Sequence, residues 1–517
     1  MISYPLNPHP KFTNFKQFID TNASRYAKDV AFQFQRSQQL TTITYQKFSD
    51  DINTLCGYFS QRGLHRSSIA VLGENSYGWI LAYFAAVMSD NIVVPVDKEL
   101  HADDIAQLLK SSDAELLICS GTYADVADTM IQNGHVKTVI SMENFSTILE
   151  IPVRTEAETN EADLCAIIFT SGTTGKPKGV MLSQKALMTD AVGACQNVYI
   201  AGSSMLTLPL HHTFAFTAGV LAMLIYHVPI SISRSLRTFA ADMKRFRPQN
   251  MFLVPLYVET MHKNIWKTAK EQGKERLLKG MIALSNFTRK FGIDLRRKLF
   301  KSVLENFGGN LTLVVSGGAA IRQEYIDSFD ALGIQVLNGY GITECAPVVA
   351  VNRNKDFCPK SIGLPLPCNN VQVINGEICV QGENVMLGYY KDEAATAEAI
   401  IDGWFHTGDL GCIDKNGFIY ITGRKKNLII LSNGKNVSPE SLEEKLLAIP
   451  DVLEVVVSAP EGVITAEVFA EQTEQERIQE NIMTLNKTLP SYQRIQQVKF
   501  RGQEFEKTTT KKIKRGM

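Results

Sequence analysis

One stretch decides the fold, residues 166–183, which read Ala-Ile-Ile-Phe-Thr-Ser-Gly-Thr-Thr-Gly-Lys-Pro-Lys-Gly-Val-Met-Leu-Ser. Residues 166–169 are an apolar run that ends abruptly. Residues 170–178 contain only hydroxyl, glycine, proline and lysine residues, and the apolar pattern resumes at 180–182. The pattern predicts a strand, a polar loop and a second strand.

The loop between these strands is suited to an anion, because its glycines let the backbone turn and approach a ligand closely. Its hydroxyl and cationic side chains are Thr170, Ser171, Thr173, Thr174, Lys176 and Lys178. We therefore expect phosphate as the ligand. The loop is not a Walker A motif, because only two residues separate Gly172 from Gly175 and Pro177 has no N–H to donate. By itself, a solvated hairpin turn is the alternative.

Length and composition limit the class of protein. The chain has 517 residues, which predicts two to four domains. A hydrophobic fraction of 45% and a charged fraction of 21% are typical of globular proteins in water. Lys and Arg together number 53, as do Asp and Glu, so no overall charge would attract nucleic acid or an anionic membrane.

Cysteine usage and apolar stretches indicate the compartment. Nine cysteines stand singly with no CxxC pair, and the N-terminus has no signal peptide, so we expect a reducing cytoplasm and no structural zinc site. Residues 214–231 are apolar, but His227 and Pro229 interrupt them. A buried helix followed by a strand is therefore expected there, and we expect no transmembrane segment.

Strand and helix patterns alternate through residues 11–110, which predicts parallel strands joined by right-handed crossovers. Residues 258–306 are predicted to be helical and are rich in Lys and Arg. These basic residues form either a solvated helical face or a patch that docks on a membrane surface or a carrier. Residues 361–422 are predicted to be all-β. A compact β/α unit with helices at 440–448 and 472–488 follows from about residue 426.

Two further segments have the same pattern, a predicted strand that ends in a turn. Residues 311–320 are a buried strand that ends in Gly317-Gly318-Ala319. Residues 335–344 are a strand, an expected Asn338-Gly339 turn, and then hydroxyl and carboxylate side chains. Doubly wound sheets bind ligands at such carboxyl ends of strands.

Together with Trp404-Phe-His-Thr-Gly-Asp409, Gly423-Arg-Lys-Lys426 and the lysine-rich tail at 507–515, these segments resemble the adenylate-forming superfamily, closest to fatty acyl-CoA synthetases. The resemblance covers essentially the whole chain. It implies an α/β fold with a large N-terminal domain of α/β subdomains plus a small β-barrel, residues 1–425. A small mobile α+β C-terminal domain, residues 426–517, would carry the catalytic lysine.

The resemblance implies a role for each motif residue. Thr170, Ser171, Thr173 and Lys178 would hold the β- and γ-phosphates of ATP, Thr343 would touch the α-phosphate, and Glu344 would bind Mg²⁺ as a hard oxygen ligand. Adenine would lie against Gly317, Gly318, Ala319, Asn338, Gly339 and Tyr340. Asp409 would accept hydrogen bonds from the ribose hydroxyls, with Arg424 nearby. For Asp409 alone, a turn-forming aspartate is the alternative.

Three residues of the C-terminal part have implied roles in the reaction cycle. Lys512 would bind the acyl carboxylate and the α-phosphate during adenylation, although Lys511 stands where the family has glycine; a disordered basic tail is the alternative. Lys426 corresponds to the hinge about which the small domain rotates. Gly434 would line the tunnel for the thiol, where only a residue without Cβ lets pantetheine pass.

The acyl pocket is read from Pro209–Gly219, which resembles the acyl-CoA synthetase version of this region. His211, His212 and Phe214 are its candidate residues. A metal-binding fragment is the alternative for the paired histidines, but no third ligand lies at suitable spacing. Amino-acid-activating relatives have an Asp in this neighbourhood, and none is present, so an apolar acid is favoured.

The resemblance implies a two-step ligase with ATP, Mg²⁺ and CoA. It would join a small-molecule carboxylic acid to AMP, release pyrophosphate, and pass the acyl group to a pantetheine thiol, with fatty acyl-CoA as the product. The alternative enzyme loads a fatty, aryl or amino acid onto the phosphopantetheine of an acyl or peptidyl carrier protein. A nucleotide-binding protein without catalysis is a third reading. Neither the chain length of the acid nor the oligomeric state follows from the sequence.

Overall fold

Strands and helices alternate along most of the chain, which folds into a larger and a smaller unit. The computed structural model describes residues 4–36, 39–151, 159–170, 177–233, 235–431, 434–507, 513 and 515. The larger unit comprises the residues up to Asn370 and Gln381–Phe405. The smaller comprises Val371–Val380 and His406–Met517. Ser171, Thr173 and Lys512 lie outside the described residues, and a domain boundary at residue 426 stays a prediction.

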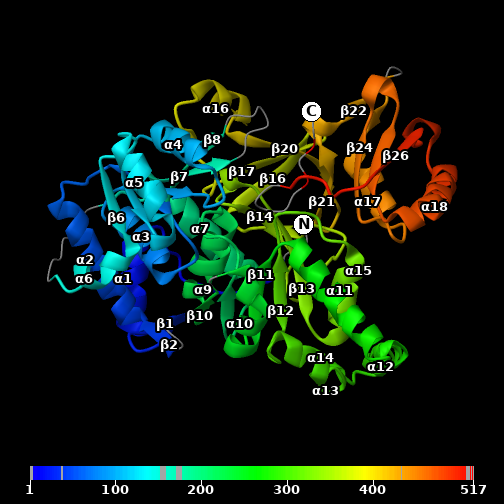
Figure 1. Ribbon diagram of the computed structural model, residues 1–517, viewed down its shortest axis with the longest axis horizontal. Coiled ribbons are helices and arrows are strands. Elements are labelled where there is room, and N and C mark those ends of the chain that lie inside the picture. The colour runs from blue at the N-terminus through cyan, green and yellow to red at the C-terminus, as the bar shows by residue number, and fades with distance from the viewer. Residues whose placement is uncertain are drawn as a thin grey trace. The chain divides into compact units, whose positions relative to one another are not determined.

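A nine-stranded sheet forms one part of the larger unit (Figure 1). Its strands, in spatial order, are β15 (Leu364–Pro365), β14 (Val348–Val351), β13 (Gln335–Gly341), β12 (Leu313–Ser316), β11 (Asn250–Leu253), β9 (Ser204–Leu206), β10 (Ile230–Ile232), β1 (Val30–Arg36) and β2 (Gln39–Thr44). The strands from β13 to β1 are parallel. Every residue of β11 and β12 is buried, as expected for strands covered on both faces.

A seven-stranded sheet forms the other part of this unit. Its order is β18 (Gly388–Tyr389), β8 (Lys178–Ser183), β7 (Leu164–Thr170), β4 (Ile92–Val96), β3 (Ser68–Leu72), β5 (Ala114–Cys119) and β6 (Thr138–Ser141). The strands from β7 to β6 are parallel, and β7 and β8 form an antiparallel hairpin with Thr170 opposite Lys178. The two predicted strands around the glycine-rich stretch are therefore confirmed, while residues 171–176 of the predicted loop lie outside the described residues.

Helices connect and cover the two sheets. They are α1 (Phe15–Arg25), α2 (Tyr45–Gln61), α3 (Tyr77–Met88), α4 (Ala102–Ser111), α5 (Ala124–Gln132), α6 (Phe145–Ile148), α7 (Gln184–Asn197), α8 (Thr213–Phe216), α9 (Ala222–Ile225), α10 (Phe239–Phe246), α11 (Pro255–Glu271), α12 (Glu275–Arg289), α13 (Arg296–Leu299), α14 (Lys301–Leu304), α15 (Gln323–Leu332) and α16 (Glu393–Ala399). The entirely apolar α3 begins after Ser76, whose side chain accepts a hydrogen bond from the Trp79 N–H. That cap satisfies one of the free N–H groups of the first turn.

The apolar segment at residues 214–231 forms a buried helix followed by a strand, as expected. α8 continues through a π-helical turn at Thr217–Leu221 into α9, and β10 follows. The whole turn Thr217–Leu221 is buried inside the larger unit. Among the described residues, no helix combines the length and the hydropathy that crossing a bilayer requires.

The smaller unit contains strands of one all-β sheet and a small α/β assembly. Most residues of β16 (Asn369–Ile374), β17 (Glu377–Gly382), β20 (Trp404–Ile413) and β21 (Ile419–Arg424) belong to this unit. It also contains β22 (Ile429–Ile430), β23 (Asn436–Val437), and a sheet of β24 (Glu454–Ser458), β25 (Thr465–Phe469) and β26 (Gln497–Arg501) with α17 (Pro439–Leu447) and α18 (Gln475–Thr488). Figure 1 shows both helices beside this sheet, where their apolar faces join one core.

Two local expectations are wrong. The Asn338-Gly339 turn does not form, because β13 continues to Gly341 by changing partners. Its first half pairs with β12 in parallel, and Gly339–Gly341 pairs with β14 in antiparallel. The predicted all-β segment contains α16, which Asp392 caps by accepting the Ala395 N–H. Only seven residues long, α16 gave too short a pattern to be distinguished from strand.

Candidate active site

The phosphate-loop candidate is held at its base by the hairpin β7–β8. Thr170 and Lys178 lie opposite one another as the last and first residues of these strands. The ammonium of Lys178 lies 4.7 Å from the centre of the Tyr389 ring, in β18. Gly179 serves packing rather than ligand approach, because a Cβ there would lie 2.9 Å from Cγ2 of Ile167. The hairpin thus carries a lysine at the edge of the predicted phosphate loop.

Glu344 lies beside the same tyrosine. It belongs to a short 3-10 turn, Thr343–Cys345, and its carboxylate is buried. The Tyr389 hydroxyl donates to its Oε1 at 2.8 Å. Burial and the adjacent carboxylate both raise the pKa of Tyr389, which keeps the phenol neutral. Tyr389 therefore contacts both candidates. Its hydroxyl binds Glu344, the predicted magnesium ligand, and its ring lies against Lys178, the predicted phosphate ligand.

The adenine candidates come from two neighbouring strands of the nine-stranded sheet. Ser316 at the end of β12 lies opposite Asn338 of β13. Gly317 follows β12, and a Cβ on it would lie 3.0 Å from the ring of Phe214. A glycine therefore lets the aromatic ring approach the backbone closely at this point, and a larger residue would push the ring away. Gly318, next in the chain, has a φ of +83°.

The Asn338 side chain holds this edge together. Its Nδ2 donates to the Ser361 carbonyl at 2.6 Å, and its Oδ1 accepts from Nδ2 of Asn352 at 2.7 Å. The position of its amide is thus fixed by protein contacts. Phe214 and Gly317 in turn place the predicted acyl residues beside the predicted adenine residues.

The paired histidines of the acyl candidate are partly buried, and the surroundings of His211 favour its neutral form. Burial, with the neighbouring His212 and Lys98, holds the pKa of His211 well below its usual value. The centres of the two rings lie 4.0 Å apart, and Nε2 of His211 lies 3.5 Å from Oδ1 of Asp97. In the described part of the chain, neither histidine belongs to a group of three potential metal ligands.

In the smaller unit, the ribose candidates are paired as the resemblance implies. Asp409 of β20 lies opposite Arg424 of β21 in the strand register. Nε of Arg424 donates to Oδ1 of Asp409 at 2.6 Å, and the Asp409 carboxylate is buried. An antiparallel pairing fixes both side chains on one face of the hairpin. The expected proximity of Asp409 and Arg424 is confirmed.

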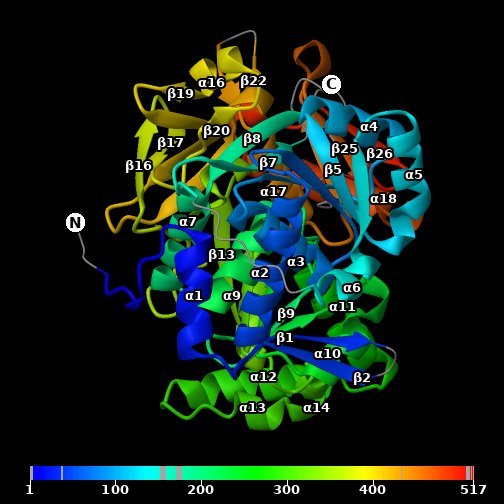
Figure 2. The same ribbon diagram turned by 90° about the vertical axis from the view of Figure 1, so that its left-hand side faces the viewer.

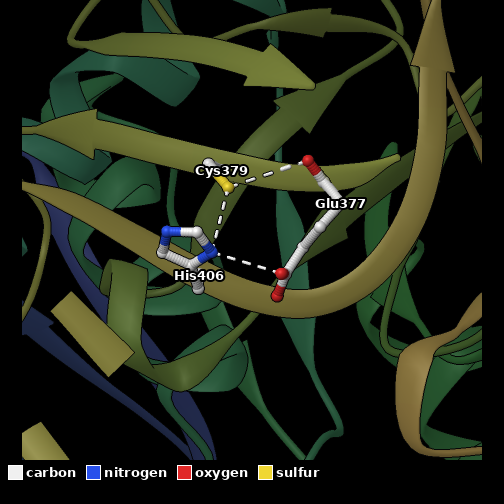
Figure 3. Close-up of side chains that lie close together, drawn as sticks. All are labelled: Glu377, Cys379 and His406. Atoms are coloured by element: carbon white, nitrogen blue, oxygen red, sulfur yellow. Dashed lines mark hydrogen bonds and ion pairs between the residues drawn. The ribbon is translucent and has the colours of Figure 1, made fainter. Parts of the chain in front are cut away.

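Sequence reasoning missed Glu377, which contacts the neighbours of this pair. Figure 3 shows its side chain beside those of His406 and Cys379. Oε1 of Glu377 accepts the Gly408 N–H at 2.8 Å, and Oε2 accepts from Nζ of Lys425 at 2.9 Å. Nδ1 of His406 lies 3.2 Å from the same Oε2. Gly408 precedes Asp409, and Lys425 follows Arg424. One buried carboxylate therefore holds the neighbours of both ribose candidates.

Charge compensation explains how Glu377 stays ionised. Burial alone would raise its pKa, but hydrogen bonds from Lys425 and His406 lower the pKa below its usual value. No local pattern in the sequence pointed to Glu377, because its partners Gly408 and Lys425 lie 31 and 48 residues away.

Glu377, Cys379 and His406 also resemble part of a metal site. Figure 3 shows the three side chains close together. Sγ of Cys379 lies 3.4 Å from Nδ1 of His406. However, Lys425 already supplies the positive charge that a metal would bring to Glu377. Burial also raises the pKa of the Cys379 thiol, which disfavours the thiolate that a metal requires. The geometry therefore fits an internal ion pair better than a metal centre.

The remaining candidates lie in the smaller unit. Lys426 belongs to the 3-10 turn Lys425–Asn427, and burial together with Arg424 and Arg515 lowers its pKa. Gly434 has a φ of +75°, and a Cβ there would meet nothing within 4 Å. The left-handed backbone conformation therefore favours glycine at this position, whereas the described residues leave room for a side chain.

Comparisons with known proteins identify the family. The family model described as AMP-binding enzyme matches residues 19–390. A long-chain-fatty-acid–CoA ligase of Mycobacterium bovis, FadD15, is 29% identical over 432 residues, which cover 75% of this chain and 70% of that protein. Long-chain-fatty-acid–CoA ligase 5 of Rattus norvegicus is 28% identical over 478 residues, covering 81% and 69%.

Solved structures confirm the predicted fold class. A fatty acyl CoA synthetase of Mycobacterium tuberculosis superposes with a TM-score of 0.71 at 21% identity, covering 97% of this chain and 96% of that one. The anthranilate CoA ligase AuaEII, in complex with anthranoyl-AMP, superposes with a TM-score of 0.79 at 18% identity, covering 98% and 96%. The family model spans most of the sequence and includes both the phosphate-loop hairpin and Glu344, and the chain therefore belongs to the family of AMP-binding enzymes.

Proposed function

We propose that the chain is an ATP-dependent acid–thiol ligase that forms a fatty acyl-AMP and then a fatty acyl-CoA. The observation that carries the proposal is the grouping of Lys178, Tyr389 and Glu344, where a cation for phosphate and a carboxylate for a divalent ion meet on one tyrosine. The fatty acid is inferred from the relatives named as long-chain-fatty-acid–CoA ligases and from the apolar residues around Phe214.

In the first step, an oxygen of the fatty acid carboxylate attacks the α-phosphorus of ATP. The new O–P bond forms as the bond from the α-phosphorus to the bridging oxygen breaks, and pyrophosphate leaves with that oxygen. Both reactants are anions, so positive charge must lie at the phosphates before attack. We assign Thr170, Ser171, Thr173 and Lys178 to the β- and γ-phosphates, Thr343 to the α-phosphate, and Lys512 to the acyl carboxylate and α-phosphate.

Glu344 fits a magnesium ion, because Tyr389 donates to one of its oxygens and an ionised carboxylate has several acceptor sites. When bound, Mg²⁺ would neutralise phosphate charge. Gly317, Gly318, Ala319, Asn338, Gly339 and Tyr340 are assigned to adenine. Asp409 is assigned to the ribose hydroxyls, with Arg424 fixing its carboxylate.

In the second step, the thiol sulfur of CoA attacks the acyl carbonyl carbon. The C–S bond forms, the C–O bond to the phosphate breaks, AMP leaves, and the thiol proton passes to solvent. We assign Lys426 to the hinge that precedes this step, Gly434 to the thiol path, and His211, His212 and Phe214 to the acyl pocket. A neutral imidazole, which burial favours at His211, suits the passage of an apolar chain.

Acid-dependent exchange of labelled pyrophosphate into ATP tests the first step. We expect exchange with fatty acids and a loss of at least about 100-fold in Glu344→Gln. Absence of exchange with every acid would overturn the enzymatic proposal.

Trapping of acyl-AMP by hydroxylamine across acids of different chain length then identifies the substrate. The best acid is finally offered with CoA or with a phosphopantetheinylated carrier protein. We expect the thioester on CoA; a thioester formed only on the carrier protein would replace CoA by the carrier as acceptor.

A further inference from the structure

The helix α12 exposes an unusual apolar stripe. The sequence spacing of Leu277, Leu284 and Phe287 places them on one helical face, and Phe291 and Ile293 follow directly after the helix. All five side chains are between 51% and 68% exposed. The opposite face of the same helix is occupied by Leu278, Met281 and Ile282, which join the core of the larger unit. The helix thus has one apolar face that packs in the core and a second apolar face, the stripe, that is exposed to solvent.

The stripe is organised locally. The ring centres of Phe287 and Phe291 lie 5.2 Å apart in an edge-to-face arrangement, so the two rings form a single apolar knob. Gly280 lies within the stripe and has nothing within 4 Å of the position of a Cβ. Figures 1 and 2 show α12 together with α13 and α14 at one end of the larger unit, away from the seven-stranded sheet. Contiguous apolar surface of this kind marks an interaction site.

Basic residues are concentrated in the segment that carries the stripe. Residues 258–306 contain twelve Lys and Arg but only five Asp and Glu. Lys279 and Arg289 are paired with Glu275 and Asp330. Lys274, Arg276 and Lys290 are exposed and form no salt bridge in the part of the chain that the structure describes, although Arg276 acts electrostatically on the adjacent Glu275. The excess positive charge is local, because the whole chain is neutral.

We propose that this apolar-basic patch, formed by Leu277, Leu284, Phe287, Phe291 and Ile293 with Lys274, Arg276 and Lys290, docks on the surface of an anionic lipid bilayer. Apolar side chains would enter the boundary between headgroups and acyl chains, while the lysines and arginine contact anionic headgroups. Charge favours this occupant over a second copy of the chain. A two-fold symmetric contact would place the same basic residues against one another. The inference does not depend on the proposed ligase activity.

Co-sedimentation with lipid vesicles tests the proposal on the full chain. The vesicles consist of phosphatidylcholine alone or of phosphatidylcholine with about one-third phosphatidylglycerol. We expect binding to the anionic vesicles to exceed binding to the neutral ones by at least about tenfold, and to weaken with salt. Equal or absent binding to both compositions would overturn the proposal.

Three variants separate the apolar and the electrostatic contributions. The double variant Phe287→Ser with Phe291→Ser should lower binding to anionic vesicles by at least about tenfold. The triple variant Lys274→Glu, Arg276→Glu and Lys290→Glu should lower it by roughly a hundredfold and remove the preference for anionic lipid. Met483→Ser is the matched control, because Met483 is an equally exposed apolar residue on α18, outside the patch. It should bind as the parent does.

Two further measurements distinguish docking from misfolding and from self-association. Melting temperatures should match the parent in all variants, because the substituted side chains are exposed. In Phe287→Trp, lipids brominated along their acyl chains should quench the new fluorescence. If sedimentation instead shows a dimer that the serine variant dissociates while vesicle binding is unchanged, the patch is a subunit interface and the proposal is wrong.

Discussion

Glu377 is the residue whose role the structure makes most specific. It accepts hydrogen bonds from Gly408 and Lys425, which flank the ribose candidates Asp409 and Arg424. Glu377→Gln keeps the shape but removes the charge that Lys425 compensates. We expect a rise of about tenfold in the KM for ATP with little change in kcat, since charge-assisted hydrogen bonds are worth more than neutral ones.

The matched control is Glu383→Gln, an exposed carboxylate paired with Lys185, which should leave both constants unchanged. A purely structural role would lower the melting temperature without separating KM from kcat. A zinc-dependent rise in the melting temperature of the parent, abolished by Glu377→Gln, would instead indicate that the Glu377, Cys379 and His406 group binds metal.

Asp190 gives a prediction about pH. It is fully buried in α7, and its Oδ1 accepts from the Val348 N–H and from Nδ2 of Asn384, both at 3.0 Å. Burial raises its pKa well above the usual value, although these two hydrogen bonds oppose the shift. Below the unfolded pKa of about 4, Asp190 is protonated in both states and its contribution to stability is fully present. Between this pH and the raised folded pKa, only the unfolded state loses the proton, so the contribution is progressively lost as the pH rises.

Asp190→Asn mimics the neutral carboxyl and removes this dependence. In the window above pH about 4 and below the folded pKa, stability of the parent should fall relative to the variant by about 1.4 kcal/mol per pH unit. Thermal unfolding of both proteins at several pH values measures the difference, in which other titrating groups cancel. A difference that is independent of pH would show that Asp190 has no raised pKa.

At the scale of elements, the structure distinguishes glycines that packing requires from glycines that it does not. Gly179 of the hairpin β7–β8 is of the first kind. A Cβ on Gly179 would lie 2.9 Å from Ile167, so Gly179→Ala should destabilise the protein by about 1–3 kcal/mol through overpacking. The same substitution at Gly280, in the exposed face of α12 where nothing lies within 4 Å, should stabilise by up to about 1 kcal/mol. Melting temperatures that change equally in both variants would contradict this account.

The same elements show what sequence could and could not predict. Strong patterns, such as the hairpin around residues 166–183 and the fully buried β12, were predicted because local periodicity dictates them. The partner change within β13 was not, because it depends on β14, whose pairing no local pattern records. Glu377 was missed for the same reason: its contacts are distant in sequence. Motif residues such as Asp409 and Arg424 were found because the family resemblance identifies them together.

At the scale of the whole molecule, the two proposed half-reactions give opposite predictions for two lysines. Lys512→Ala removes the charge proposed to hold the acyl carboxylate and α-phosphate. It should lower adenylation by at least about 100-fold and affect thioester formation from ready-made acyl-AMP much less. Pyrophosphate exchange and thioester formation from synthetic acyl-AMP are measured separately. Equal loss of both would remove Lys512 from the adenylation step.

Lys426→Pro should do the reverse. Lys426 lies in the short turn Lys425–Asn427, and proline there fixes φ at about −65°, which restricts the few backbone rotations that a domain hinge needs. Adenylation should therefore proceed while thioester formation is blocked. The control Lys415→Pro alters another exposed turn of the smaller unit, outside the proposed hinge, and should spare thioester formation. Normal overall turnover in Lys426→Pro would mean that the second step requires no rotation at this residue.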